Sequence, residues 1–423
     1  MNINAYKQVV LDQKKEKDEI DLTRLASRRE EAYFDWNSPL AQIVIGVRRS
    51  GKSTICHKAL QQNHINYGYI NFDDERLYDL KAENLNTVLE ALYMVYGDFQ
   101  YLFFDEIQNV ETWFLFVNRL LRQKIRLLIT GSNAKLLSAE LSTHLTGRYH
   151  QIELFPFSFS EFLKYKNIRS DDDSTRGVAF KKRAFEEYLS QGGFPELFEV
   201  KNKKAYIKNL FHSIIARDIR CRFSVRYPEA LRKMADYLTD TIATEINYRR
   251  LAEQFSFGSS HTAENYVGFL RQAYLLVGIQ KFSFKSKERV RNEKNYAIDP
   301  AFISAAKEGF SEKNLGWRLE NIVCIELLRR RNQTLNDVYY YRNGYEIDFV
   351  LCSDNQVVEL IQVSADMSSE KTFNRETNAL FRAASELKCD RLTIVTLNED
   401  GEYADAGRKI KIISIQNWLN SIE

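Results

Sequence analysis

The chain has 423 residues, of which 44% are hydrophobic and 28% are charged, so it is long enough for two to four domains of an ordinary globular protein. Sixty lysines and arginines stand against 57 aspartates and glutamates, and the formal net charge of +3 excludes a partner selected by global charge. The five cysteines are scattered and never form a C-x-x-C pair, which argues against a disulfide framework and a zinc site.

These counts also predict a location. No apolar run approaches the roughly 18 to 20 residues that a membrane span needs, and the N-terminus lacks the apolar core of a signal peptide. Free thiols are typical of reducing compartments. We therefore expect a cytoplasmic protein with no membrane segment.

The first 160 residues divide into an arm and a core. Residues 1–25 carry a dense run of mixed charge, which predicts a solvated helix or arm. Their residue types do not indicate a function. Residues 26–160 alternate apolar strand-like runs with helix-like segments, which is typical of an α/β core with a parallel sheet.

A phosphate-binding loop is predicted near the start of this core. Residues 41–45 form an apolar run typical of a buried strand, and residues 53–62 have helical character. The G-x-x-x-x-G-K-[ST] pattern lies between them, and the residues that we expect to bind a nucleoside triphosphate are Gly46, Arg48, Arg49, Ser50, Gly51, Lys52, Ser53 and Thr54. Free N–H groups at a helix N-terminus attract phosphate oxygens. Lys52 is expected to reach the β- and γ-phosphates, and the hydroxyl of Ser53 to bind Mg²⁺.

Two carboxylates follow the next apolar strand. Residues 101–104 run directly into Asp105 and Glu106. Because the carboxyl ends of parallel strands deliver side chains to the ligand crevice of an α/β sheet, both acids are expected beside the loop. Asp105 is the candidate Mg²⁺ ligand, through water, and Glu106 is the candidate general base for the attacking water. The alternative is a strand end with two solvated acids.

Polar residues end the following strand as well. Asn133, with Ser132 as second choice, can hydrogen-bond the attacking water or the γ-phosphate, but it can equally cap the next helix. Arg148 precedes a strand-like run and is the candidate arginine finger, acting in cis or from a neighbouring subunit of an oligomer. Its alternative is an arginine at the surface or in a salt bridge.

Together these motifs resemble the P-loop core of AAA-type ATPases, with residues 46–54 as Walker A, Asp105 and Glu106 as Walker B, residues 130–133 as the sensor-1 stretch and Arg148 at the finger position. The whole chain is similar to a group of bacterial and archaeal AAA-like ATPases with a C-terminal domain of unknown function. The matching runs are residues 48–49, 105–108, 130–132, 155–162, 192–196 and 346–350. The resemblance implies binding and hydrolysis of ATP with Mg²⁺.

The middle of the chain predicts two further parts. Residues 161–235 form helices broken near Gly192 and Pro228 and fit the helical lid of AAA-type cores. Residues 236–305 predict helix, short turn and helix, and then a ribbon on which Lys285, Lys287, Arg289 and Arg291 alternate with other residues. This pattern resembles a winged helix that binds DNA through residues 249–291. A solvated face is one alternative. A protein partner is another, because the second helix carries few cations.

The last part, residues 306–423, resembles the restriction-endonuclease-like fold, in which a Glu, an Asp and an E-x-K triplet bind metal and activate water. Glu320 and Asp348 match the first two positions, but the triplet falls on Gln362, Val363 and Ser364. An alternative register restores the acid with Glu359 but puts Ile361 at the lysine position. We therefore expect a scaffold that has lost phosphodiesterase chemistry.

The resulting prediction is an α/β protein, with a P-loop NTPase sheet, a helical lid, a winged-helix-like middle domain and a C-terminal α/β restriction-endonuclease-like domain. Its predicted function is Mg²⁺-dependent ATP hydrolysis coupled to a macromolecular partner, with DNA and a protein as the candidates. Two alternatives are an ATP-gated DNA-binding switch with incidental turnover and an active metal-dependent nuclease.

Overall fold

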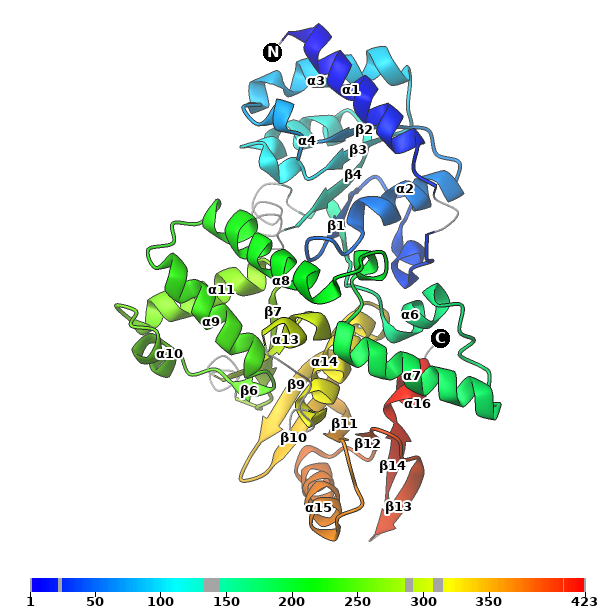
Figure 1. Cartoon of the computed structure of the whole chain (residues 1–423), viewed down its shortest axis with the longest axis vertical. Helices are drawn as coiled ribbons and strands as arrows, with labels where there is room; N and C mark the ends of the chain where they lie inside the picture. Colours follow the sequence, from blue (N-terminus) through cyan, green and yellow to red (C-terminus); the bar gives the residue numbers. More distant parts are fainter. Residues whose placement is uncertain are drawn as a thin grey trace. The chain divides into compact units, whose positions relative to one another are not determined.

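The computed structural model describes residues 2–21, 25–132, 145, 147–285, 292–306, 315–405 and 407–421. The chain forms two compact units (Figure 1). Residues 1–156 and 272–274 belong to the first unit, and residues 157–271 and 275–423 belong to the second.

The first unit is built on a five-stranded parallel sheet with the order β2-β3-β4-β1-β5. Its strands are β1 (Ala41–Ile45), β2 (Tyr67–Asn71), β3 (Tyr101–Asp105), β4 (Arg126–Gly131) and β5 (Tyr149–Glu153). Its helices are α1 (Ile3–Asp18), α2 (Lys52–Gln62), α3 (Leu85–Tyr96) and α4 (Trp113–Arg122). Every residue of β1 and β3 is buried, which is why these strands read as unbroken apolar runs in the sequence. The predicted P-loop NTPase sheet is confirmed.

Helix α1 belongs to the body of the first unit rather than to a solvated arm. It packs against α3 and β2, and it buries Tyr6, Val9 and Val10. The buried amide of Gln13 continues the hydrogen bonding of β2, accepting from the N–H of Asn71 at 2.9 Å and donating to its carbonyl at 3.0 Å. Of the charged residues that suggested a solvated arm, Lys15, Glu16, Asp18 and Glu19 are exposed, whereas the ammonium group of Lys17 lies 4.8 Å from the centre of the Tyr67 ring.

The second unit is built on a nine-stranded mixed sheet with the order β13-β14-β12-β11-β10-β9-β7-β8-β6. The strands are β6 (Thr244–Glu245), β7 (Leu276–Lys281), β8 (Glu293–Ala297), β9 (Asp337–Arg342), β10 (Glu346–Ser353), β11 (Gln356–Ser364), β12 (Leu392–Thr396), β13 (Gly401–Asp405) and β14 (Arg408–Ser414). The helices are α6 (Phe159–Tyr165), α7 (Thr175–Gln191), α8 (Lys203–Ile214), α9 (Pro228–Asp240), α10 (Tyr248–Gln254), α11 (Ser260–Gln272), α13 (Pro300–Ala306), α14 (Leu315–Thr334), α15 (Glu370–Leu387) and α16 (Ile415–Asn420). A π-helical segment, Ile215–Arg220, continues α8.

One sheet joins parts that the sequence predicts as separate domains. Strand β7, from residues 236–305, pairs in parallel with β9, from residues 306–423, through Gln280 opposite Tyr339 and Lys281 opposite Tyr340. The sheet is covered on both faces, and alternate residues of β11 face different cores: Ile361 packs in the core that contains α14, and Leu360 packs in the core that contains α15.

The helices after residue 157 share the core of the second unit. Phe159 and Phe162 of α6 and Tyr188 of α7 pack in one cluster with Leu319 of α14 and Trp418 of α16. The break after α7 is anchored by Asp299, which accepts from the N–H of Gly193 at 2.9 Å. A lid role for these helices stays a prediction.

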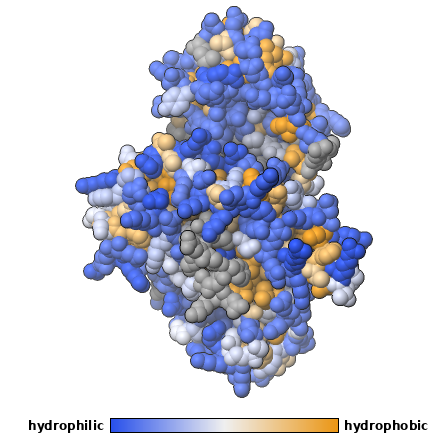
Figure 2. Space-filling view, viewed as in Figure 1, coloured by the Kyte–Doolittle hydropathy of each residue, from blue (hydrophilic) through white to orange (hydrophobic). Residues whose placement is uncertain are grey.

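The surface has the pattern of an ordinary globular protein. Figure 2 shows a mostly hydrophilic face on which hydrophobic residues lie in small groups. Among the helices of the described residues, none combines the length and the apolar composition that a membrane crossing requires.

Candidate functional site

The loop between β1 and α2 has the backbone of a phosphate-binding loop. Gly51 is the N-cap of α2 with a φ of 93°, and Arg49 has a φ of 67°, so the chain turns through the left-handed region before the helix begins at Lys52. Gly46 begins the turn with a φ of 153°, and a Cβ there would lie 2.1 Å from the carbonyl oxygen of Leu154. Only glycine fits at this position.

Lys52 is held between the loop and the acidic pair. Its side chain is 5% exposed, and its Nζ donates to the carbonyl oxygen of Val47 at 3.1 Å. The same Nζ lies 3.8 Å from Oε1 of Glu106. The ammonium group therefore lies within the curve of the loop, where phosphate oxygens bind in proteins of this fold.

Asp105 is the centre of a buried network at the end of β3. Its Oδ1 accepts hydrogen bonds from Ser53 Oγ at 2.9 Å and from Thr130 Oγ1, and its Oδ2 accepts from the hydroxyl of Tyr69 at 3.3 Å. Burial, with the charge of Glu106, raises the pKa of Asp105 to about 6, although the bonds from Thr130 and Ser53 oppose this shift. The predicted metal pair, Ser53 and Asp105, is thus brought into direct contact.

Glu106 is held in an uncommon backbone conformation. Its φ of 55° lies in the left-handed region, which costs free energy for a residue with a Cβ. The N–H of Glu106 donates to Thr130 Oγ1 at 3.1 Å, and the side-chain amide of Gln108 donates to Glu106 Oε2. Thr130 therefore contacts the carboxylate of Asp105 and the backbone of Glu106, a role that the sequence analysis did not assign to it.

Arg28 is a buried residue of this site that the sequence analysis missed. Its Nη1 donates to the carbonyl of Ser50 at 3.1 Å and its Nη2 to the carbonyl of Phe155 at 2.6 Å. It thus ties the loop to the segment that follows β5. No local pattern marks Arg28, because its partners lie 22 and 127 residues away in the sequence.

The remaining loop residues differ in exposure. Arg48 pairs with Asp73 at 3.5 Å and Arg49 is exposed, whereas Ser50 is buried and has a hydroxyl without a hydrogen-bond partner. Thr54 is half-buried in the first turn of α2.

The structure describes the predicted sensor and finger only in part, and it places the finger away from the loop. Asn133 lies outside the described residues, and Ser132 is buried at the end of β4. Arg148 is exposed and precedes β5, and its carbonyl accepts from the N–H of Ala41. Strands β1 and β5 are parallel, and Ala41 lies opposite Tyr149 at their amino ends. Arg148 therefore lies at the amino end of the strands and Gly46 at the carboxyl end, roughly 20 Å away along the strands.

These residues fit ATP and Mg²⁺. Ser53 and Asp105 supply a hydroxyl and a carboxylate oxygen, the hard ligands that Mg²⁺ takes together with water and phosphate oxygens. The buried ammonium of Lys52, the glycine-only position at Gly46 and the N–H groups that begin α2 suit an anionic phosphate chain.

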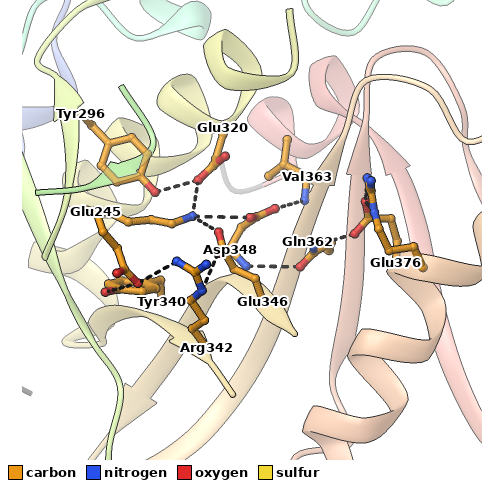
Figure 3. Close-up of polar contacts among 12 residues, drawn as sticks. Glu245, Tyr296, Glu320, Tyr340, Arg342, Glu346, Asp348, Gln362, Val363 and Glu376 are labelled. Carbon is orange, nitrogen blue, oxygen red and sulfur yellow. Dashed lines mark hydrogen bonds and ion pairs between the residues drawn. The ribbon is translucent and has the colours of Figure 1, made fainter. Parts of the chain in front are cut away.

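The nuclease-like residues belong to the second unit. Glu320 of α14 and Asp348 of β10 both lie near the ammonium of Lys294 (Figure 3). Gln362 lies across from Asp348, whereas Glu359 is three residues earlier on β11 and points to the opposite face of the sheet. There Glu359 accepts from Thr393 at 2.7 Å and pairs with Arg391 at 3.2 Å, so the alternative register does not bring an acid to Asp348.

The residues predicted to contact DNA are described in part. Helices α10 and α11 are joined by a short turn, and β7 and β8 pair as an antiparallel hairpin with β6 beside β8. Lys285 is described and exposed, whereas Lys287, Arg289 and Arg291 lie outside the described residues.

Family models match three consecutive segments of the chain. An AAA domain matches residues 38–163, a domain of unknown function (DUF8612) matches residues 182–314, and a second one (DUF4143) matches residues 315–418. Among solved structures, the Walker-type ATPase of Pyrococcus abyssi is 16% identical and covers 67% of this chain and 96% of that chain, with a TM-score of 0.45. The RuvB Holliday junction branch migration motor of Thermotoga maritima is 17% identical and covers 56% and 81%, with a TM-score of 0.31.

Two relatives resemble the chain over most of its length. An uncharacterized protein of Methanocaldococcus jannaschii is 34% identical over 394 residues, which are 89% of this chain and 87% of that protein. An uncharacterized protein of Haemophilus influenzae is 30% identical over 394 residues, which are 89% of this chain and 94% of that protein. The chain, with an AAA-type P-loop ATPase fold followed by two domains of unknown function, belongs to the same family as these two proteins.

Proposed function

We propose that the first unit binds ATP with Mg²⁺ and hydrolyses its γ-phosphate, and that the nucleotide state controls a macromolecular partner. The observation that carries this proposal is the network in which Ser53 and Thr130 donate to one oxygen of Asp105 beside Lys52 and Glu106. It combines a metal-ligand pair, a phosphate-binding cation and a base within one buried site.

The residues divide the work by their chemistry. The loop N–H groups and Lys52 bind the phosphates, and Ser53 and Asp105 hold the metal ion. Bound Mg²⁺ supplies positive charge to the phosphate oxygens. Glu106 accepts a proton from the attacking water and orients it.

The contact between Lys52 and Glu106 links binding to catalysis. Oε1 of Glu106 lies 3.8 Å from Nζ of Lys52, and its Oε2 accepts from Gln108. When Lys52 turns to a phosphate, Glu106 loses a cationic partner and gains freedom to bind water. We therefore propose that Glu106 becomes an effective base only after the phosphates are bound.

The binding step is tested by Lys52→Ala, with Lys81→Ala as the control because Lys81 is exposed in the same unit. Isothermal titration calorimetry with a non-hydrolysable ATP analogue and Mg²⁺ is expected to show about 100-fold weaker binding for Lys52→Ala, since a charged hydrogen-bond donor is lost. The control should bind like wild type. Equal affinities in all three proteins would contradict the phosphate-loop assignment.

A second candidate function is a DNA-binding switch. The order α9, β6, α10, α11, β7 and β8 supports a winged-helix-like segment. However, the exposed residues of α11 include His261, Glu264 and Asn265, and its one arginine, Arg271, pairs with Glu293. A helix with this surface is poorly suited to phosphates, which favours a protein as the partner.

The two partners differ in their salt dependence. If the segment binds DNA, affinity for a duplex in 50 mM salt should fall steeply at 200 mM salt and should fall further in Lys285→Ala/Lys287→Ala. Fluorescence anisotropy with labelled duplex measures both effects. No binding at 50 mM salt would leave the protein partner as the proposal.

The proposed location is a reducing compartment such as the cytoplasm. All five cysteines are free thiols, and four of them, Cys56, Cys324, Cys352 and Cys389, are buried. Buried free thiols persist where the surroundings are reducing.

A further inference from the structure

A lysine in the second unit lies among three carboxylates, those of Glu320, Glu346 and Asp348, which are labelled in Figure 3. Lys294, on β8, has a side chain that is 2% exposed. Its Nζ lies 3.0 Å from Oε1 of Glu320, 2.5 Å from Oε1 of Glu346 and 3.8 Å from Oδ1 of Asp348. The carboxylates come from α14 and β10, so one ammonium group joins three elements of the unit.

The oxygens around Lys294 are fixed by further hydrogen bonds. The hydroxyl of Tyr296 donates to the same oxygen of Glu320 at 2.8 Å, and the N–H of Val363 donates to Oδ2 of Asp348 at 2.9 Å. The side chains of Glu320 and Asp348 are 11% and 10% exposed, so water contributes little to their solvation. The cluster is therefore preorganised around a cation.

The cation in this cluster is the ammonium group itself. Glu320 and Asp348 are the acids that match the metal ligands of the restriction-endonuclease-like fold, and Lys294 lies between them. A divalent ion needs oxygen ligands at about 2.0 to 2.6 Å, and it repels a lysine ammonium at such a distance. As the side chains stand, no group of three or more His, Cys, Asp or Glu among the described residues is arranged to hold a metal ion, so a metal site here requires the carboxylates to move together once the ammonium group is removed.

The side-chain amide of Gln362 makes a structural contact instead of binding a metal ion. Its Oε1 accepts from the N–H of Asp348 at 3.2 Å, and its Nε2 donates to Oε2 of Glu376 on α15 at 2.6 Å. A carboxylate at this position would lose the second bond and would face the carboxylate of Glu376. The amide thus bridges β10 and α15, and the third acid of a nuclease site is replaced by a structural contact.

We propose that the ammonium group of Lys294 is the permanent cation of the Glu320, Glu346 and Asp348 cluster, which closes this cluster to divalent metal ions and ties β8 to α14 and β10. The residues therefore do not fit a metal-dependent nuclease. The inference concerns the second unit alone and stands whether or not the first unit hydrolyses ATP.

The test compares wild type with Lys294→Met, which removes the charge at similar volume, and with Lys294→Arg, which keeps the charge. A fourth protein, Lys294→Met/Asp348→Asn, removes a carboxylate as well. Titration of each full-length protein with MnCl₂, without nucleotide, counts bound ions by calorimetry. Any ion taken up by the first unit is common to all four proteins and cancels in the comparison.

Lys294→Met should gain one Mn²⁺ site that wild type, Lys294→Arg and the double variant lack. Its thermal midpoint should fall by about 5 to 10 °C, because the buried carboxylates of Glu320 and Asp348 lose their cation, whereas Glu346 keeps Arg342 at 3.8 Å. Mn²⁺ should restore much of this loss. Any effect of Mn²⁺ on the midpoint of wild type should come from the first unit and should be the same in Asp348→Asn.

Two results would overturn the proposal. One is a folded Lys294→Met that gains no Mn²⁺ site. The second result concerns wild type and Asp348→Asn. It is Mn²⁺ binding by wild type, or Mn²⁺-dependent nicking of plasmid DNA by wild type, that Asp348→Asn abolishes. If Lys294→Met does not fold even with Mn²⁺, the comparison of wild type with Asp348→Asn decides, and equal Mn²⁺ binding by these two proteins supports the proposal.

Discussion

At the scale of one residue, the buried charge of Asp105 lowers the stability of the folded state. Its carboxylate is 2% exposed and accepts three hydrogen bonds, yet burial and the charge of Glu106 still raise its pKa to about 6. A group with a raised pKa favours the folded state only when it is protonated. As the pH rises from about 4 to above 6, the folded state therefore loses up to about 3 kcal/mol relative to the unfolded state.

Asp105→Asn should stabilise the nucleotide-free protein at neutral pH. The amide oxygen can still accept from Ser53 and Thr130, and no charge is buried. We expect a higher thermal midpoint of the first unit than in wild type at pH 7.5, and a smaller difference at pH 4.5, measured by scanning fluorimetry. A difference that is equal at both pH values would show that ionisation of Asp105 is not its cause.

At the scale of elements, the sequence predicts what local patterns encode. The strand predicted over residues 101–104 is β3, Tyr101–Asp105, and the helix predicted over residues 53–62 is α2, Lys52–Gln62. The strand is an apolar run that ends in an acid, and the helix begins directly after Gly51. The roles of Arg28 and Lys294 could not be predicted from local patterns, because their partners are distant in the sequence. Arg28 contacts Phe155, and Lys294 contacts Glu346.

The buried side chain of Arg28 supports the phosphate loop. In Arg28→Met, the carbonyls of Ser50 and Phe155 lose their donors, and the free energy of unfolding of the first unit should fall by about 2 to 4 kcal/mol. Binding of ATP should weaken as well, since the loop loses an anchor. Arg122→Met is the control, because Arg122 is exposed at the end of α4, and urea unfolding measures both variants. Equal stabilities would remove Arg28 from the support of the loop.

At the scale of the whole molecule, the candidate nucleotide site and the Lys294 cluster are built on two different sheets. The parallel sheet of the first unit gathers polar side chains at the carboxyl ends of its strands, whereas the mixed sheet of the second unit holds the cluster of Lys294. That β7 and β9 form one sheet was not predictable, since strand pairing between distant segments leaves no local periodicity.

The position of Arg148 makes a prediction about assembly. Arg148 and Gly46 lie at opposite ends of the parallel strands, so Arg148 cannot reach a phosphate bound to the loop of its own chain. A role in catalysis therefore requires a neighbouring subunit. Arg148→Ala and Lys52→Ala should each be inactive alone, and their mixture should recover part of the ATP turnover, because mixed oligomers contain complete sites. A mixture without activity would argue against a finger in trans.

The central claim is that Glu106 performs the hydrolytic step at a site built to bind ATP. Phosphate release by wild type and Glu106→Gln, measured beside the affinity of each for ATP and Mg²⁺, tests it most directly. We predict affinities within about threefold and phosphate release at least about 100-fold slower in Glu106→Gln, the usual contribution of a general base. Equal rates of phosphate release at equal affinity would contradict this account.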